Sequence, residues 1–269
     1  GLKKVISWTG AMEPSYTLAS QALKVLCDLE VEPKQIQRVT EQTAERARSL
    51  QEKEIERLGR PATRASPVPV EARPETCVIE MDGTCVLGRD GEYHEVKCGT
   101  IFGLEDRIVE DKETGQRSQL LRRSYTATSQ GIKAFGSMVW AMAVSWGVRS
   151  ARQVVVIGDG AEWIWKYTKE RFYFEGVNGE AHKPIEILDF YHACENLAKA
   201  RDLIFAQPDS APAKKWYDYW RKRVRDGAVD ELIAELKRRE KRCDSPARLQ
   251  ALQVRRGYFE THRGRMDYP

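Results

Sequence analysis

The order of strand-like and helix-like segments limits what this chain can fold into more than any other feature. Three strand-like segments come in succession, and two later ones are separated by helix-like stretches: Cys77–Leu87, Tyr93–Phe102, Ser124–Thr128, Gln153–Asp159 and Ile185–Asp189. Consecutive strands with short links pair antiparallel, whereas strands joined through a helix need parallel crossovers. The sequence therefore predicts an α/β protein with a mixed sheet and the order β-β-β-α-β-α-β-α.

That order is typical of an RNase H-like domain of the retroviral integrase type, expected over residues 76–195. Helical spacing over residues 14–57 predicts an N-terminal helical domain, 1–59, with an apolar stripe formed by Leu18, Ala22, Leu23, Leu26 and Cys27. A proline-rich stretch, 60–75, predicts a linker. Residues 196–262 predict an all-helical basic insertion, and residues 263–269 the start of a truncated C-terminal segment.

The charge of the chain is unevenly distributed. The net charge is +4 and the pI near 8.7, but residues 196–269 hold 18 Lys and Arg against 11 Asp and Glu. The first 195 residues hold 26 against 29. A basic segment on a near-neutral body indicates a polyanionic partner, usually nucleic acid, although charged helices are more often simply solvated.

Several classes are excluded by composition. With 41% hydrophobic and 31% charged residues, the chain is neither disordered nor fibrous. We find no signal peptide, and the most apolar stretch, Gly131–Val148, contains Lys133 and is expected to be a buried helix rather than a membrane span. Six cysteines without a C-x-x-C pair predict reduced core thiols in a cytoplasmic protein.

Two aspartates follow apolar strands, and each is followed by glycine: Asp82 and Asp159. Asp-Gly alone often only forms a turn. In the expected sheet, however, the two strands are neighbours, so both carboxylates would lie at the same end. Converging carboxylates suit Mg²⁺ or Mn²⁺, and paired metals support in-line displacement at phosphorus.

Four segments together resemble prokaryotic insertion-sequence DDE transposases: Val78–Thr84, Glu95–Lys97, Val156–Trp165 and Asp189–His192. The last is a D-x-x-H motif, which points to the Mutator-like group, nearest the Kra-type insertion sequences. The resemblance covers about residues 15–269. It implies an RNase H-like fold with an all-helical insertion and Asp82 and Asp159 as metal-binding acids for Mg²⁺ or Mn²⁺. It further implies Asp189 and His192 beside the site, double-stranded DNA of element ends and target as partner, and a homo-oligomer without membrane or nucleotide cofactor.

The chain departs from that family at the third acid, a glutamate on the helix after the insertion. Met266–Pro269 resembles the segment just before it, and no residue matches the glutamate itself. Glu195 comes too soon after the fifth strand, and Glu260 lies in the last insertion helix. We therefore expect a fragment with two of three acids, which binds metal weakly and is poorly active or inactive alone.

Histidine and basic residues supply further candidates. His192 is expected either to organise the site or to touch DNA, and a zinc site with Cys194 lacks a second pair of ligands. His94, His182 and His262 belong to no recognisable group. The residue pattern over Thr17–Thr43, a helix, a short turn and a second helix, is typical of a helix-turn-helix motif, in which Lys34 and Arg38 would contact DNA. A plain helical hairpin is the alternative. Further phosphate-contacting candidates are Arg122, Arg123, Lys214, Lys215, Arg221, Lys222, Arg223, Arg225, Lys237, Arg238, Arg239, Lys241, Arg242, Arg255 and Arg256. The interleaved Trp216 and Trp220 are expected to be buried.

Three different functions compete with an active transposase. A haloacid-dehalogenase-type phosphatase would use Glu80–Thr84 and Gly158–Gly160, but Glu80 replaces its nucleophilic aspartate. An RNase H-like nuclease would share the two-metal chemistry. A catalytically incomplete or domesticated transposase fragment would act as a DNA- or partner-binding module, which the missing glutamate favours.

Overall fold

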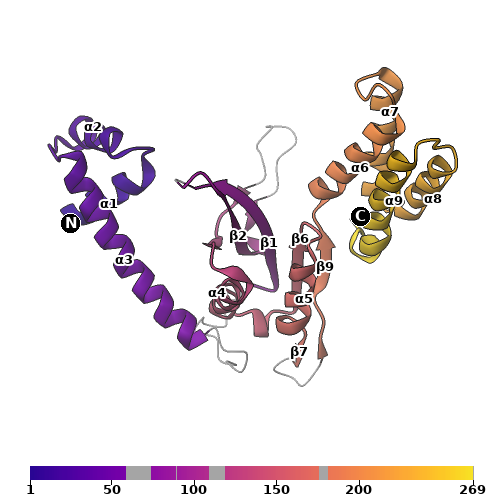
Figure 1. Cartoon of the computed structure of the whole chain (residues 1–269). Coiled ribbons are helices and arrows are strands. Elements are labelled where there is room, and N and C mark those ends of the chain that lie inside the picture. The colour runs from indigo at the N-terminus through magenta and orange to yellow at the C-terminus, as the bar shows by residue number, and fades with distance from the viewer. Residues whose placement is uncertain (59–73, 89, 109–118, 176–180, 269) are drawn as a thin grey trace. The chain divides into compact units, whose positions relative to one another are not determined.

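The chain forms two compact units, Gly1–Arg60 and Pro61–Pro269. A computed structural model describes residues 1–58, 74–88, 90–108, 119–175 and 181–268, and Figure 1 shows both units. The linker expected over 60–75 lies outside the described residues, except for Pro74 and Glu75.

The first unit is a cluster of three helices: α1 (Leu2–Met12), α2 (Tyr16–Cys27) and α3 (Pro33–Leu58). Of these, α1 lies outside the helices expected over 14–57. The core consists of Ile6, Ala19, Leu23 and Ile36. Ser15 caps α2, since its side chain accepts a hydrogen bond from the backbone N–H of Leu18, and Asp28 ends the helix in the left-handed region.

The apolar stripe expected on α2 is wrong in part. Leu18 and Leu26 are 45% and 80% exposed, and Cys27 is also exposed. Leu23 is buried as expected, Ala22 is half-buried, and the helix also buries Ala19, which was not in the expected stripe. A short helix in a three-helix unit has one narrow line of contact, so apolar residues on either side of that line stay in water.

The second unit contains a five-stranded mixed sheet with the strand order β5-β2-β1-β6-β9. Its strands are β1 (Thr76–Leu87), β2 (Tyr93–Gly103), β5 (Ser124–Thr128), β6 (Gln153–Gly158) and β9 (Ile185–Leu188). The first three pair antiparallel, while β6 pairs parallel with both β1 and β9. A mixed α/β fold with a mixed sheet is thus confirmed.

Strand β1 is longer than its parallel neighbour. It pairs with β6 only from Thr76 to Met81 and continues along β2 as far as Leu87. The overhanging end forms a two-stranded ribbon among the described residues, and its tip is exposed, with Leu87 at 63%. Asp82 lies at the start of this overhang.

Two helices lie between the later strands: α4 (Gly131–Ser145) and α5 (Glu162–Arg171). Helix α4 packs on β2 and β5 and buries Phe135, Val139 and Ala143 completely. Helix α5 buries Ile164 and contacts α4 through the edge-to-face pair of Phe135 and Trp163. These apolar faces cover the sheet and fix the ends of β5 and β6.

Two small two-stranded pairs were not predicted: β3 (Arg107–Ile108) with β4 (Gln119–Leu120), and β7 (Phe174–Glu175) with β8 (Ala181–His182). Two-residue strands carry too little periodicity to be recognised in a sequence.

The remaining chain is helical: α6 (Phe190–Ile204), α7 (Ala211–Arg225), α8 (Val229–Glu240), α9 (Pro246–His262) and the short η4 (Arg263–Arg265). Trp216 and Trp220 are 9% and 6% exposed, so their expected burial is confirmed. Helix α6 runs without a break past Glu195, where the insertion was expected to begin. The helical part therefore continues directly from the helix that follows β9.

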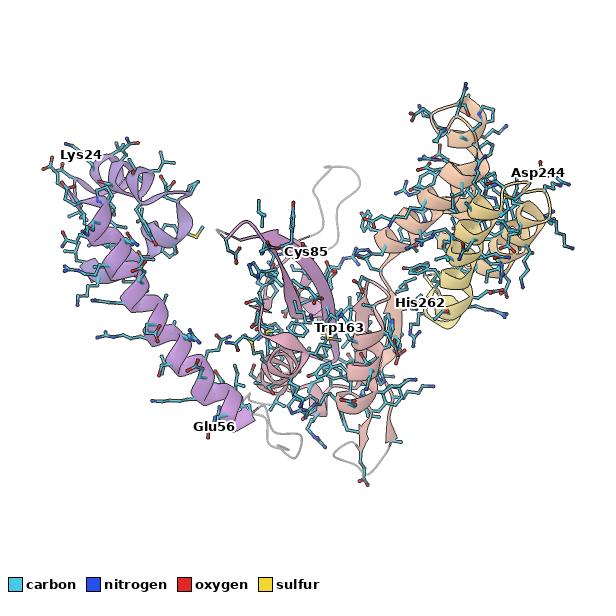
Figure 2. The ribbon with its side chains drawn as sticks, viewed as in Figure 1. Lys24, Glu56, Cys85, Trp163, Asp244 and His262 are labelled. Atoms are coloured by element: carbon cyan, nitrogen blue, oxygen red, sulfur yellow. The ribbon has the colours of Figure 1, made fainter. Side chains whose placement is uncertain are left out.

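All six cysteines are free, but only Cys77 and Cys194 are buried. Cys27 is exposed, and so is Cys85, which Figure 2 labels. The expectation of core thiols is thus correct for two of them. No helix in the described part of the chain has the length and apolar character that crossing a membrane requires.

Candidate functional site

Three aspartates form a row across three neighbouring strands, at the carboxyl ends of β6 and β9 and at the same level within β1. The strand register pairs Met81 of β1 with Gly158 of β6, and Gly158 with Leu188 of β9. The residue after each is an aspartate, so Asp82, Asp159 and Asp189 follow at the same level. We call these three residues the acid row. The expectation that Asp82 and Asp159 lie at the same end of the sheet agrees with this register.

Local hydrogen bonds orient each carboxylate of the acid row. Asp82 Oδ1 accepts from the backbone N–H of Gly83 at 2.7 Å, and Asp159 Oδ1 accepts from that of Ala161 at 2.8 Å. Asp189 caps α6 by accepting from the backbone N–H of Tyr191 at 2.8 Å. Each of these bonds uses one carboxylate oxygen and leaves the second one for a ligand.

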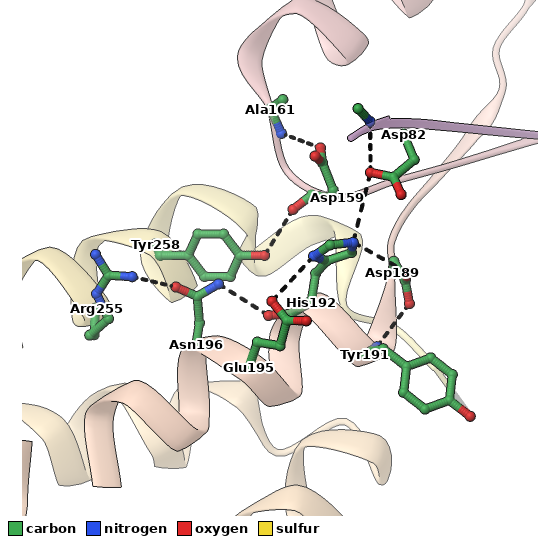
Figure 3. Close-up of polar contacts among 11 residues, drawn as sticks. Asp82, Asp159, Ala161, Asp189, Tyr191, His192, Glu195, Asn196, Arg255 and Tyr258 are labelled. Atoms are coloured by element: carbon green, nitrogen blue, oxygen red, sulfur yellow. Dashed lines mark hydrogen bonds and ion pairs between the residues drawn. The ribbon is translucent and has the colours of Figure 1, made fainter. Parts of the chain in front are cut away.

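His192, in the first turn of α6, lies among three acidic side chains (Figure 3). Its Nε2 is 3.9 Å from Asp82 Oδ1 and 3.8 Å from Asp189 Oδ2. Its Nδ1 is 3.6 Å from Glu195 Oε2. These separations exceed hydrogen-bond length, so the imidazole is near the carboxylates without being fixed by any one of them. The D-x-x-H spacing brings Asp189 and His192 together beside Asp82.

Among the residues that the structure describes, the acid row has no basic partner other than this histidine. In the described part of the chain, no lysine or arginine forms an ion pair with Asp82, Asp159 or Asp189. The negative charge of the acid row affects the pKa of Glu80, which lies two residues before Asp82 on the same face of β1. Partial desolvation and the carboxylates of Asp189 and Asp82 raise the pKa of Glu80. The local electrostatics therefore favour a bound cation.

The acid row fits a divalent cation only as an incomplete cage. Among the described residues, no group of three or more His, Cys, Asp or Glu side chains is arranged to hold a metal ion. Mg²⁺ usually takes one or two carboxylates and completes its shell with water and substrate phosphate. The carboxylates of the acid row are oriented, have a free oxygen each and pair with no lysine or arginine of the described residues, so they match the coordination that Mg²⁺ requires.

Lys97 is a buried lysine near the candidate site that sequence reasoning did not single out by itself. It pairs with Gly83 across β1 and β2, so its side chain lies on the opposite face of the sheet from Asp82, and it is only 7% exposed. Its Nζ lies 2.6 Å from Glu95 Oε2 and 5.4 Å from the ring centre of Trp163, a residue that Figure 2 labels. A lysine in the middle of a strand was the available signal.

A second group that sequence reasoning missed comes from α9. Tyr258 donates a hydrogen bond from its hydroxyl to the backbone carbonyl of Asp159 at 3.1 Å. Arg255 Nη1 donates to Asn196 Oδ1 at 2.8 Å, and Asn196 Nδ2 donates to the carbonyl of His192 at 3.1 Å. Figure 3 shows both connections running from α9 toward the acid row. Arg255, expected to contact phosphate, is thus engaged inside the protein.

The predicted basic residues of the helical part fall into two sets. In the described part of the chain, Lys214, Lys215, Lys222 and Arg225 of α7 are exposed and form no ion pair, and the same holds for Lys241 and Arg242 after α8. The other set is engaged with neighbouring side chains, as the following contacts show. Arg221 lies over the Phe190 ring, Arg223 pairs with Glu231, Lys237 with Glu260, Arg238 and Arg239 with Glu235, and Arg256 with Glu240 and Glu260.

The remaining candidates lie elsewhere. Arg122 pairs with Asp106 at 3.1 Å and lies over the Trp146 ring, and Arg123 lies over the Tyr125 ring. Lys34 and Arg38 are exposed on α3 of the first unit.

No protein-family model matches this chain, and no curated protein matches it significantly. The fold and the site define a mixed α/β protein with a row of carboxylates across three neighbouring strands, at the level where β6 and β9 end.

Proposed function

We propose that this protein is a DNA transposase of the DDE type, which cleaves phosphodiesters at the ends of its element and joins the freed 3′-hydroxyl to target DNA. The acid row carries this proposal. Asp82 and Asp159 are at the same level of adjacent parallel strands, and no arginine or lysine of the described residues neutralises them. Carboxylates left in this state are suited to divalent cations and phosphate substrates.

The sheet supports an RNase H-like assignment. In order along the chain, the five strands of the main sheet would be numbered 3-2-1-4-5 across it, with the first three antiparallel and the last two parallel to the first. Parallel strands place their carboxyl ends at one edge, and ligands of open α/β sheets bind there. The position of the acids therefore agrees with the proposed fold.

In the proposed reaction, each residue of the site would have a separate role in binding metal or in orienting the carboxylates. Bound Mg²⁺ or Mn²⁺ would activate the attacking oxygen and stabilise the leaving one. Asp82 and Asp159 would bind the cations through their free oxygens, while the backbone N–H groups of Gly83 and Ala161 hold the carboxylates in orientation. His192 would orient Asp82 and Asp189 from the centre of the cluster.

The exposed cations of α7 would bind the DNA backbone. Lys214, Lys215, Lys222 and Arg225 carry charges with no ion-pair partner among the described residues, and neutralising phosphates with such groups releases counterions. Replacing the four with glutamine should lower DNA affinity and reduce the slope of log K against log salt by about 0.9 for each lost phosphate contact. Arg238→Gln is the matched control, because Arg238 is already paired with Glu235 at 2.9 Å.

The decisive experiment measures metal-dependent cleavage and strand transfer on element-end DNA. Because no residue of this sequence matches the third acid, the assay uses a form of the protein that carries such a glutamate, with Mg²⁺ or Mn²⁺, beside its Asp82→Asn and Asp159→Asn variants. Both variants should lose activity by about 10²-fold or more. Glu170→Gln, an exposed acid on α5 outside the acid row, serves as control. Undiminished cleavage by the two aspartate variants would contradict the proposal.

A second candidate function is a DNA- or partner-binding module without catalysis. It is favoured by the absence of a three-residue metal cage among the described residues. DNA binding that depends on the α7 cations, combined with no cleavage under any divalent metal, would select this module.

The choice of substrate separates the transposase from a phosphatase and from a simple nuclease. In a haloacid-dehalogenase-type phosphatase, the motif strand leads into a helix, whereas β1 runs through Gly83 and Thr84 and pairs antiparallel with β2. Turnover of a phosphomonoester would nevertheless select that class. Cleavage without strand transfer would select an RNase H-like nuclease.

A further inference from the structure

Helix α9 lies almost one hundred residues beyond Asp159 in the chain, yet it contacts the loop that carries this acid. The Tyr258 hydroxyl donates to the Asp159 carbonyl at 3.1 Å, across a sequence separation of 99 residues. Burial, together with the charges of Asp159 and Asp189, raises the pKa of Tyr258, so the hydroxyl keeps its proton and remains a donor.

The loop itself leaves little freedom at this point. Gly160 has φ +102°, a conformation that side-chain-bearing residues rarely adopt. A Cβ placed there would lie 3.1 Å from each of three side chains, those of His262, Leu188 and Tyr258. The loop backbone is therefore in close contact with α9, and the turn that directs the Asp159 carboxylate is formed against the Tyr258 ring.

The Tyr258 ring is in turn held by its neighbours. His262 is 5% exposed, and its ring centre lies 4.8 Å from that of Tyr258 and 6.2 Å from that of Trp165 on α5. The tyrosine therefore lies in a packed aromatic group rather than on a mobile surface. A packed ring holds its hydroxyl at a fixed point, which a positioning contact requires.

We propose that Tyr258 is a positioning residue for Asp159, so that α9 holds the second acid of the metal site in its productive orientation. This inference rests on the proposed function, because it assigns Asp159 to a metal. The chain from Arg255 through Asn196 to the His192 carbonyl gives α9 a second contact with the same site. Helix α9 would thus support two parts of the site at once.

The test compares two tyrosine-to-phenylalanine variants. Tyr258→Phe removes the hydroxyl next to Asp159. Tyr167→Phe is the matched control, since the Tyr167 hydroxyl also donates to a buried backbone carbonyl, that of Gly136, which belongs to α4. Both variants lose a hydroxyl that donates to a backbone carbonyl, but only the Tyr258 bond reaches the acid row.

Two readouts are measured on the complete chain. The first is hydrogen exchange of the Ala161 amide, which donates to Asp159 Oδ1 and reports the loop without any metal. We expect about fivefold faster exchange in Tyr258→Phe, the effect of losing one hydrogen bond, and no change in Tyr167→Phe. The second is Mn²⁺ affinity by electron paramagnetic resonance, expected to fall about tenfold in Tyr258→Phe only.

The outcomes separate the two proposals. Unchanged Ala161 exchange in Tyr258→Phe, or equal acceleration in both variants, would overturn the positioning role whatever the metal does. If the unaltered protein binds no Mn²⁺, or if Asp159→Asn binds it equally well, the proposed function fails instead. The Ala161 exchange would still decide whether Tyr258 holds the loop.

Discussion

At the scale of single residues, the acid row is a concentration of negative charge that no lysine or arginine of the described residues pairs with, and only His192 lies beside it. Removing one charge while keeping the oxygen that accepts from the Ala161 amide should relieve repulsion. Without divalent metal, we expect Asp159→Asn to be more stable by about 1 kcal/mol, which raises Tm by roughly 2–4 °C for a unit of this size. Differential scanning calorimetry in chelator measures this.

In the same calorimetry experiment with Mn²⁺, we expect the unaltered protein to have a higher Tm than Asp159→Asn. The unaltered protein should gain stability with metal concentration, because a ligand that binds only the folded state stabilises it, and Asp159→Asn should gain less. Asp218→Asn, on α7 and away from the acid row, is the control and should leave Tm unchanged. A lower Tm for Asp159→Asn in chelator would mean that its charge is compensated within the fold.

Glu80 gives the acid row a pH dependence. Its folded pKa lies above the ordinary value of 4.5, first through desolvation and then through Asp189 and Asp82. The stability that this group contributes is fully present below pH 4.5 and is lost as the pH rises through the raised pKa. As the pH rises from 4.5 through the raised pKa of Glu80, the free energy of unfolding should therefore fall less in Glu80→Gln than in the unaltered protein. Urea unfolding from about pH 4 to 8 measures this, and parallel curves would contradict it.

At the scale of elements, the contact between α9 and the loop after β6 should be sensitive to one added methyl group. Gly160→Ala meets both the positive φ and three side chains at 3.1 Å, and we expect a loss of roughly 1–3 kcal/mol. Gly257→Ala, within α9 and with open space around it, should instead gain about 0.5–1 kcal/mol. Chemical denaturation of both variants checks the contrast, and equal effects would contradict the close packing.

The sequence predicts the elements better than it predicts their contacts. Strand and helix periodicities are local, so the five main strands and the acids Asp82 in β1 and Asp159 after β6 could be placed from residues alone. The partners of Asp159 on α9 could not, because Tyr258 and His262 reach the loop only through tertiary packing. For the same reason, helical spacing could not distinguish the free cations of α7 from Arg238 and Arg239, which Glu235 neutralises.

At the scale of the whole molecule, the two units have separate cores. Leu23 is 1% exposed within the core of the first unit, and Leu23→Ala should cost that unit about 2–5 kcal/mol while leaving the second unaffected. Tryptophan fluorescence separates the two, since Trp8 is the single tryptophan of residues 1–60 and is 63% exposed. The far-UV circular dichroism transition should move to lower denaturant concentration while the fluorescence transition stays in place. A joint shift would show that the units unfold together.

The overhang of β1 has a kinetic consequence. From Gly83 to Leu87, the strand has β2 on one side and no second strand among the described residues on the other. In an antiparallel pair, successive amides point alternately toward and away from the partner. Amide exchange along this ribbon should therefore alternate between slow and fast from one residue to the next, and the slow positions should report how often the ribbon frays beside Asp82. The lifetime of that end of the sheet, rather than its average structure, would then limit how long the acid row stays assembled.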